Sequence, residues 1–115
     1  MKQKIDKPKN DVIYVRVSTE EQIKGFSLDN QEKFCKELSQ KDGHNVLALF
    51  REEGESAKTA DRTELQKMML FCAKNKKQIK RLVIYKIDRL SRKSGDYHTL
   101  KIFFNSLGIS IVGEA

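Results

Sequence analysis

Short apolar runs alternate along the chain with longer segments in which apolar residues recur every three or four positions. The runs are rich in β-branched and aromatic residues and are too short to form helices, so they predict buried strands. The four runs cover residues 12–15, 46–50, 82–85 and 109–112.

The segments between these runs have the periodicity of amphipathic helices. Ser27 can cap the first helix at its start and Gly43 can end it. Asp61 and Glu64 have the spacing of a capping box for the second, and Gly108 ends the third. The apolar faces contain Leu28, Phe34, Cys35 and Leu38, then Leu65, Met68, Met69 and Cys72, then Tyr97, Leu100, Phe103, Phe104 and Leu107.

The predicted order is β-α-β-α-β-α-β, which is typical of an α/β fold with a mainly parallel sheet and helices on both faces. Residues 1–10 are rich in lysine and are expected to form a flexible basic tail, which leaves 11–115 as one domain. No helix follows the fourth strand, so we expect a domain that is truncated at its C-terminus.

Charge and composition limit the classes of function that are open to the chain. The 115 residues carry a formal net charge of +7, which suits a nucleic acid partner, although a lysine-rich surface alone would also produce it. No apolar stretch approaches the roughly 20 residues of a membrane span, and the first ten residues lack the apolar segment of a signal peptide. We therefore expect a cytoplasmic protein without a membrane partner.

The cysteines and histidines do not have the spacing of metal ligands. Cys35 and Cys72 fall on apolar helix faces and are expected to be buried free thiols. His44 and His98 lie in polar contexts and are expected to be ordinary surface residues.

Arginines follow the predicted strands. The carboxyl ends of parallel strands meet at one edge of a sheet, where sites form. Arg16, Arg62, Arg89 and Arg92 lie in three such loops. Several guanidinium groups together match phosphate oxygens and suit the charge of a phosphoryl-transfer transition state without a metal.

Ser18 directly follows the first strand, where its hydroxyl can face this edge. Dense positive charge would lower the cost of forming its alkoxide. Asp88 could carry the proton or only orient an arginine. Neither histidine lies in these loops, so the sequence has no Ser-His-Asp pattern.

Three ordered motifs resemble those of the serine recombinases, the resolvase and invertase family. Residues 14–22 (YVRVSTEEQ) resemble the first signature, and residues 87–92 (IDRLSR) resemble the second. Between them, Gly54-Glu55-Ser56 followed by Asp61-Arg62 is similar to the central motif. Residues 25–31 resemble an insertion of the family's large members, the integrases and transposases of phages and mobile elements.

The resemblance implies a role for each site residue. Ser18 would attack the DNA phosphodiester and form a 5′-phosphoserine linkage, followed by strand exchange and religation. Asp88 would handle the proton or orient an arginine. Arg16, Arg62, Arg89 and Arg92 would surround or assist at the phosphate, and Gln22, Gln31 and Ser56 would bind or position near it.

The resemblance also implies partners. Family members carry a long helix and a DNA-binding domain that are absent from these 115 residues. Specific recombination sites would be bound through those missing regions, and the full-length protein would form a homodimer and a tetramer. No cofactor and no metal are expected.

Two other function classes remain open at this point. A metal-dependent nuclease would use Asp88 with acids such as Asp11 and Glu114. A non-catalytic, receiver-like regulatory module could have the same sheet, but it would not explain the arginines.

Overall fold

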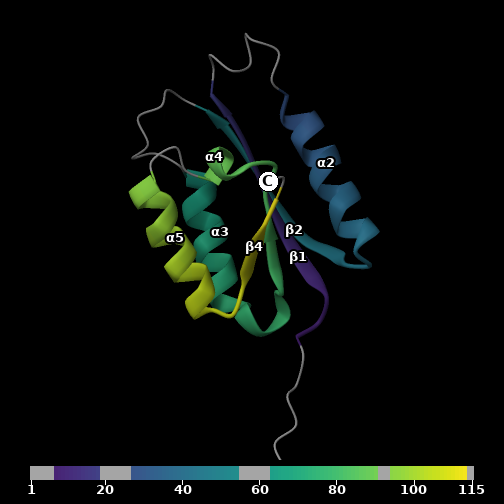
Figure 1. The fold of residues 1–115 in the computed structure, drawn as a ribbon, viewed down its shortest axis with the longest axis vertical. Helices are drawn as coiled ribbons and strands as arrows, with labels where there is room; N and C mark the ends of the chain where they lie inside the picture. The colour runs from purple at the N-terminus through teal and green to yellow at the C-terminus, as the bar shows by residue number, and fades with distance from the viewer. Residues whose placement is uncertain (1–6, 19–26, 55–62, 91–93, 114–115) are drawn as a thin grey trace, which may run out of the picture.

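The four strands of the described residues form one all-parallel sheet. A computed structural model describes residues 7–18, 27–54, 63–90 and 94–113, with the backbone alone for Ser18, Gly54, Ile87, Asp88 and Ser94. The strand order is β2-β1-β3-β4, and Figure 1 shows the long strands β1 and β2 side by side. The strands are β1 (Asn10–Ser18), β2 (Asn45–Gly54), β3 (Arg81–Val83) and β4 (Ser110–Val112).

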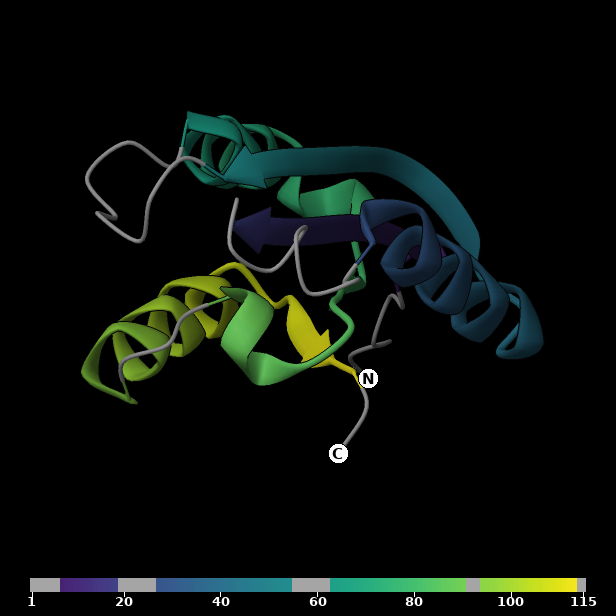
Figure 2. The same ribbon diagram turned by 90° about the horizontal axis from the view of Figure 1, so that it is seen from above.

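Helices cover both faces of this sheet. Figure 2 shows α2 on one face and α3 with α5 on the other. The predicted α/β class and the alternating order are therefore confirmed, with two short helical segments, η2 and α4, added to that order. The helical segments are α2 (Leu28–Lys41), α3 (Thr63–Lys74), η2 (Lys76–Gln78), α4 (Ile87–Leu90) and α5 (Ser94–Ser106).

The ends of α2 follow from its local sequence. Ser27 has an extended backbone, and its side chain accepts a hydrogen bond from the Asn30 amide at 3.3 Å. Asp42 caps the other end, and Gly43 then takes a φ of +74°, a conformation that side chains with a Cβ rarely adopt. Both helix boundaries expected from the sequence are confirmed.

The alternation of β1 divides the core into two layers. Val12 and Tyr14 face α3 and α5, whereas Ile13, Val15 and Val17 face α2. All five side chains are fully buried. The central strand is therefore covered on both faces, as its continuous apolar run predicts.

The two cysteines lie in different layers. Cys72 packs with the α3 and α5 layer and Cys35 with the α2 layer. Burial raises the pKa of each thiol to about 12. The expected buried free thiols are confirmed.

The observed elements differ in places from the sequence-based expectation. The third strand ends at Val83, not at residue 85. The second strand extends to Gly54, beyond the apolar run 46–50 that predicted it. The sequence patterns also did not predict α4, one turn of which places Leu90 in the core with no exposed surface.

Residues 7–10 of the expected basic tail contact the sheet domain. The Lys7 ammonium donates to the carbonyl oxygens of Ile79, Leu107 and Gly108 at 3.0, 2.8 and 2.9 Å, and β1 already begins at Asn10. These contacts anchor residues 7–10 to the domain. Residues 1–6 lie outside the described residues.

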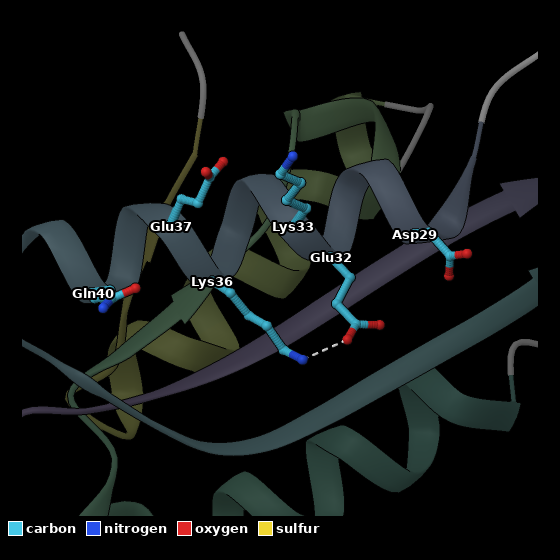
Figure 3. Close-up of a pocket in the computed structure, with 6 residues that line it drawn as sticks. All are labelled: Asp29, Glu32, Lys33, Lys36, Glu37 and Gln40. Atoms are coloured by element: carbon cyan, nitrogen blue, oxygen red, sulfur yellow. Dashed lines mark hydrogen bonds and ion pairs between the residues drawn. The ribbon is translucent and has the colours of Figure 1, made fainter.

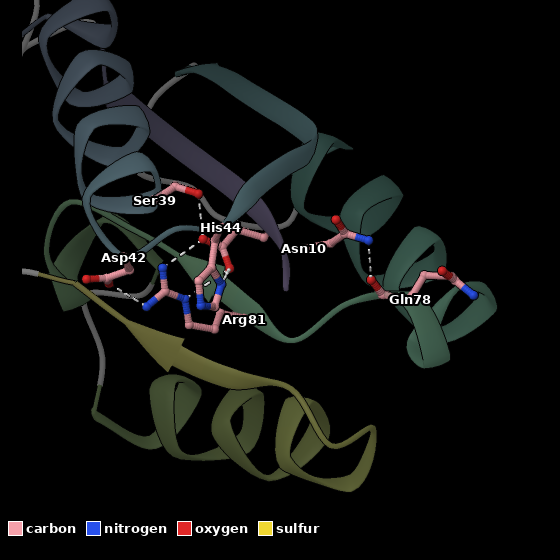
Figure 4. A network of polar contacts seen from close by, with 7 residues as sticks. Asn10, Ser39, Asp42, His44, Gln78 and Arg81 are labelled. Carbon is pink, nitrogen blue, oxygen red and sulfur yellow. Dashed lines mark hydrogen bonds and ion pairs between the residues drawn. The ribbon is translucent and has the colours of Figure 1, made fainter. Parts of the chain in front are cut away.

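A polar network closes the amino end of the sheet (Figure 4). Arg81 donates to both carboxylate oxygens of Asp11, at 2.9 and 2.8 Å, and Ser39 donates to Asp11 at 2.6 Å. His44 Nδ1 lies 2.9 Å from the same carboxylate, and its side chain is only 10% exposed. The prediction of an ordinary surface histidine is therefore wrong for His44, whereas His98 is exposed.

Candidate active site

Two of the predicted arginines meet at the carboxyl end of β1. Arg16 precedes Ser18 by two positions in β1, and Arg89 lies in α4, which follows β3 and contacts β1. Arg16 Nε donates to the Arg89 carbonyl at 3.0 Å, and Arg89 Nη1 donates to the Arg16 carbonyl at 3.0 Å. The first and last motifs are thus joined by reciprocal hydrogen bonds between each side chain and the other backbone.

Gln31 of α2 completes this arrangement. Its amide nitrogen donates to the Arg16 carbonyl at 2.9 Å, and its amide oxygen accepts from the Arg16 N–H at 3.2 Å. Gln31 is only 3% exposed. Its side chain therefore bonds to Arg16 as a neighbouring strand would, and it links α2 to the site.

The short length of β3 explains why side chains take this position. The pairing of β1 with β3 ends at Ile13 and Val83, so β1 extends several residues beyond its neighbour on that side. Buried backbone groups require hydrogen-bond partners. Gln31 and Arg89 supply them at Arg16, in place of a strand.

The electrostatics of this cluster favour an anion. Arg16 and Arg89 are 8% and 4% exposed, and each has at least one further interaction with its surroundings. Burying charge is costly unless it is compensated by hydrogen bonds or an opposite charge. Two neighbouring guanidinium groups can provide the planar donors that suit phosphate oxygens.

Ser18 and Asp88 belong to the same end of the sheet by their backbones. Ser18 is the last residue of β1 and pairs with Gly54 of β2. Asp88 lies in α4 directly before Arg89. The structure says nothing of either side chain, and four further predicted site residues lie outside the described residues: Gln22, Ser56, Arg62 and Arg92.

Glu52 is a residue of this region that the sequence analysis missed. It accepts hydrogen bonds from the Tyr14 hydroxyl at 3.0 Å and from the Glu64 and Leu65 amides at 3.2 and 3.1 Å. It thereby caps the start of α3, which begins directly after Arg62. Asp61 of the predicted capping box lies outside the described residues.

A period-two signal could have found Glu52. Ala48 and Phe50 precede it at alternate positions of β2 and pack against the same core layer. Continuing that alternation places Glu52 on the inward face, where a carboxylate needs donors.

The geometry does not support the metal-dependent nuclease. Asp11 lies near the amino end of β1, whereas Ser18 is at its carboxyl end, and Asp11 is paired with Arg81. Glu114 lies outside the described residues. Among the residues that the structure describes, no three His, Cys, Asp or Glu side chains are grouped as metal ligands.

A hollow along the outer side of α2 is a weaker candidate (Figure 3). Its lysines and acids are interspersed, and Glu32 pairs with Lys36 at 2.6 Å and with Arg51 of β2. The hollow therefore offers no concentrated charge of one sign. Its lining residues are Asp29, Glu32, Lys33, Lys36, Glu37 and Gln40.

Comparison with known families decides the relationship. The family described as "Resolvase, N terminal domain" matches residues 12–114. The chain belongs to the resolvase family. The resemblance to this family is confirmed, and the match argues against the receiver-like alternative.

Solved resolvase-type structures have the same fold. The N-terminal catalytic domain of TP901-1 integrase superposes with a TM-score of 0.78 and 27% identity, covering 91% of this chain and 76% of that chain. A resolvase family site-specific recombinase from Streptococcus pneumoniae gives 0.78 with 23% identity, covering 90% and 70%. The second similarity supports the fold alone.

Curated relatives include a Bacillus subtilis (strain 168) protein named "Putative DNA recombinase". It is 40% identical over 82 residues, which are 70% of this resolvase domain and 15% of the relative. The chain thus spans a small part of that protein. An "Uncharacterized immunity region protein 3" of Bacillus phage phi105 is 43% identical over 63 residues, 54% of this chain and 77% of the relative.

No helix within the described residues is long and apolar enough to cross a membrane. At the site, α2 and α4 place Gln31 and Arg89 beside β1, and sites commonly form at the carboxyl ends of parallel strands.

Proposed function

We propose that this chain is the catalytic domain of a site-specific DNA recombinase and that Ser18 is its nucleophile. The Ser18 hydroxyl oxygen attacks a DNA phosphorus atom, and the bond from phosphorus to the 3′ oxygen breaks. This forms a 5′-phosphoserine and a free 3′-hydroxyl. After strand exchange, a 3′-hydroxyl attacks the phosphoserine and restores the DNA and the serine.

The observation that carries this proposal is the reciprocal bonding of Arg16 and Arg89 at the end of the strand that terminates in Ser18. A pentacoordinate phosphorus gains negative charge, and preorganised donors stabilise charge that develops in a transition state. A cluster held by backbone bonds needs little reorganisation when the phosphate arrives. Such a site can act without a metal or another cofactor.

Gln31 acts in this proposal as a positioning residue. Both of its polar groups bind the Arg16 backbone, so it fixes the strand from which Arg16 and Ser18 project. A misplacement of about 1 Å can reduce a rate by about 10²-fold.

The remaining site residues keep the roles implied by family resemblance. Asp88 handles a proton or orients an arginine. Arg62 and Arg92 assist at the phosphate, and Gln22 and Ser56 position it. The partner is DNA, bound at specific sites through regions outside this chain, and the complete protein acts as a dimer that pairs into a tetramer in the cytoplasm.

The test is to trap the covalent intermediate. The chain is joined to a family DNA-binding region and incubated with a nicked suicide substrate, and the adduct is digested for peptide mapping. We expect the nucleotide on the peptide that contains Ser18. Ser18→Ala should abolish the adduct while leaving DNA binding intact, because affinity comes mainly from other contacts.

The matched control is Ser110→Ala. Ser110 is exposed and begins β4 at the other end of the sheet, so its loss should leave the adduct unchanged. An adduct in the Ser18→Ala protein, or loss of cleavage on adding a chelator, would refute the proposal in favour of another nucleophile or a metal.

A further inference from the structure

The end of the sheet opposite Ser18 carries a second concentration of positive charge. Residues 74–80 contain Lys74, Lys76, Lys77 and Lys80 and no acidic residue. They join α3 to β3 through η2, at the bottom of the molecule in Figure 1.

Hydrogen bonds bring the start of β1 to the same place. The Asn10 side chain donates to the Gln78 carbonyl at 2.9 Å, and the Lys80 amide donates to the Asn10 carbonyl at 2.8 Å. Lys9 therefore lies beside this segment. We call the surface of Lys9, Lys74, Lys76, Lys77 and Lys80 the basic pole.

The charge of the basic pole is not neutralised within the described residues. None of its five lysines has an ion pair there, whereas the nearby acids Asp11 and Asp42 are both held by Arg81. The neighbouring Lys7 is affected by this charge. Its pKa lies below the ordinary value, mainly because of burial and secondly because of the positive charge of Lys76.

The composition of the pole indicates the kind of partner. Its only apolar residue between 74 and 80 is Ile79, which is fully buried. Protein interfaces are depleted in lysine and rely on apolar or aromatic anchors. Lysine clusters without such anchors are typical of contacts to nucleic acid phosphates.

We propose that the basic pole is a second nucleic acid contact surface, which binds backbone phosphates far from the bond that Ser18 would cleave. β1 separates the two places by eight residue steps from Asn10 to Ser18, or about 26 Å at roughly 3.3 Å per residue. One phosphate cannot reach both. The pole would therefore hold another part of the same duplex or a second duplex, and its binding needs no cleavage.

The test uses the 115-residue chain and a labelled 30-base-pair duplex of arbitrary sequence. Binding is measured by fluorescence anisotropy across a salt series for a Lys76→Gln/Lys77→Gln double variant. The matched control is Lys33→Gln/Lys101→Gln, which removes the same charge from exposed positions on α2 and α5. Circular dichroism and the melting temperature establish that both variants remain folded.

The affinity falls as salt rises, and each lost phosphate contact makes the slope of log K against log salt less steep by about 0.9. The pole variant should therefore lose about 1.8 from the slope and bind on the order of tenfold more weakly at low salt, while the control stays within about twofold. Equal slopes for the two variants would overturn the proposal. Equally tight binding of polyglutamate would overturn the nucleic acid assignment, and neither result depends on Ser18.

Discussion

Replacing Glu52 by alanine tests whether the buried carboxylate joins β2, β1 and α3 as its contacts indicate. The substitution removes the acceptor of the Tyr14 hydroxyl and of two first-turn amides of α3. Glu52 is only 8% exposed, so water has little access to replace it. The loss should therefore appear as a lower free energy of unfolding.

The magnitude follows from three contributions. Loss of a helix N-cap costs about 1 kcal/mol, and loss of the hydrogen bond to Tyr14 costs about 1 kcal/mol. Removing a negative charge from a helix N-terminus costs about 0.3–1 kcal/mol. Together they predict about 2–3 kcal/mol, or roughly 8–12 °C in melting temperature for a domain of this size.

Urea unfolding followed by circular dichroism measures this quantity. Glu52→Gln keeps one acceptor oxygen and should lose about half as much. Glu53→Ala is the matched control, because its exposed neighbouring side chain should change stability by less than about 0.5 kcal/mol. If Glu52→Ala and Glu53→Ala unfold alike, the capping role is refuted.

Three further outcomes are expected. In a polypeptide that carries the DNA-binding region, Arg89→Lys should lower the cleavage rate by about 10²–10³-fold, nearly as much as Arg89→Ala, since a point charge cannot replace the planar donors. A wild-type rate of the lysine variant in single-turnover assays would show that charge alone suffices. Burial alone would raise the pKa of Asp11, but hydrogen bonds from Arg81, Ser39 and His44 hold that pKa below its ordinary value. Its ionised form therefore adds stability above pH of about 4 that is lost as pH falls further, and unfolding between pH 5 and 2 should depend less on pH in Asp11→Asn. Residues 1–115 alone should bind DNA weakly, without sequence preference and with strong salt dependence, and should not recombine it; tight binding to one site over its scrambled version would contradict this.

Most of the fold could be predicted because the apolar runs of the strands are short and continuous. Val12 to Val15 read directly as a buried strand, and all four side chains have no exposed surface. The spacing of Leu65, Met68 and Cys72 likewise predicts the buried face of α3. These elements can be predicted without tertiary information, because the spacing of their apolar residues is visible within the segment itself.

The missed features depend on contacts between distant segments. Glu52 forms part of β2 because its donors come from β1 and α3. His44 is partly buried because Asp11 lies 33 positions away in the sequence but beside it in space. A hydropathy pattern assigns such polar residues to the solvent-exposed surface, because it contains no information on the distant partner that compensates for their burial.

The candidate site was predictable to a similar extent. Strand-end logic placed Arg16 and Arg89 at one edge, and their reciprocal hydrogen bonds agree with it. The bonding of Gln31 to the Arg16 backbone was not readable from residue types, because an amide side chain that replaces a strand leaves no periodic signal.

The placement of the two cysteines gives the chain a pair of natural reporters for partial opening. A high thiol pKa and complete burial make Cys35 and Cys72 inert until the surrounding layer separates. The sheet lies between them, so an alkylating reagent that modifies one before the other would reveal which helical layer detaches first. The rates of the two reactions would then resolve local unfolding of α2 from that of α3 and α5 without any engineered label.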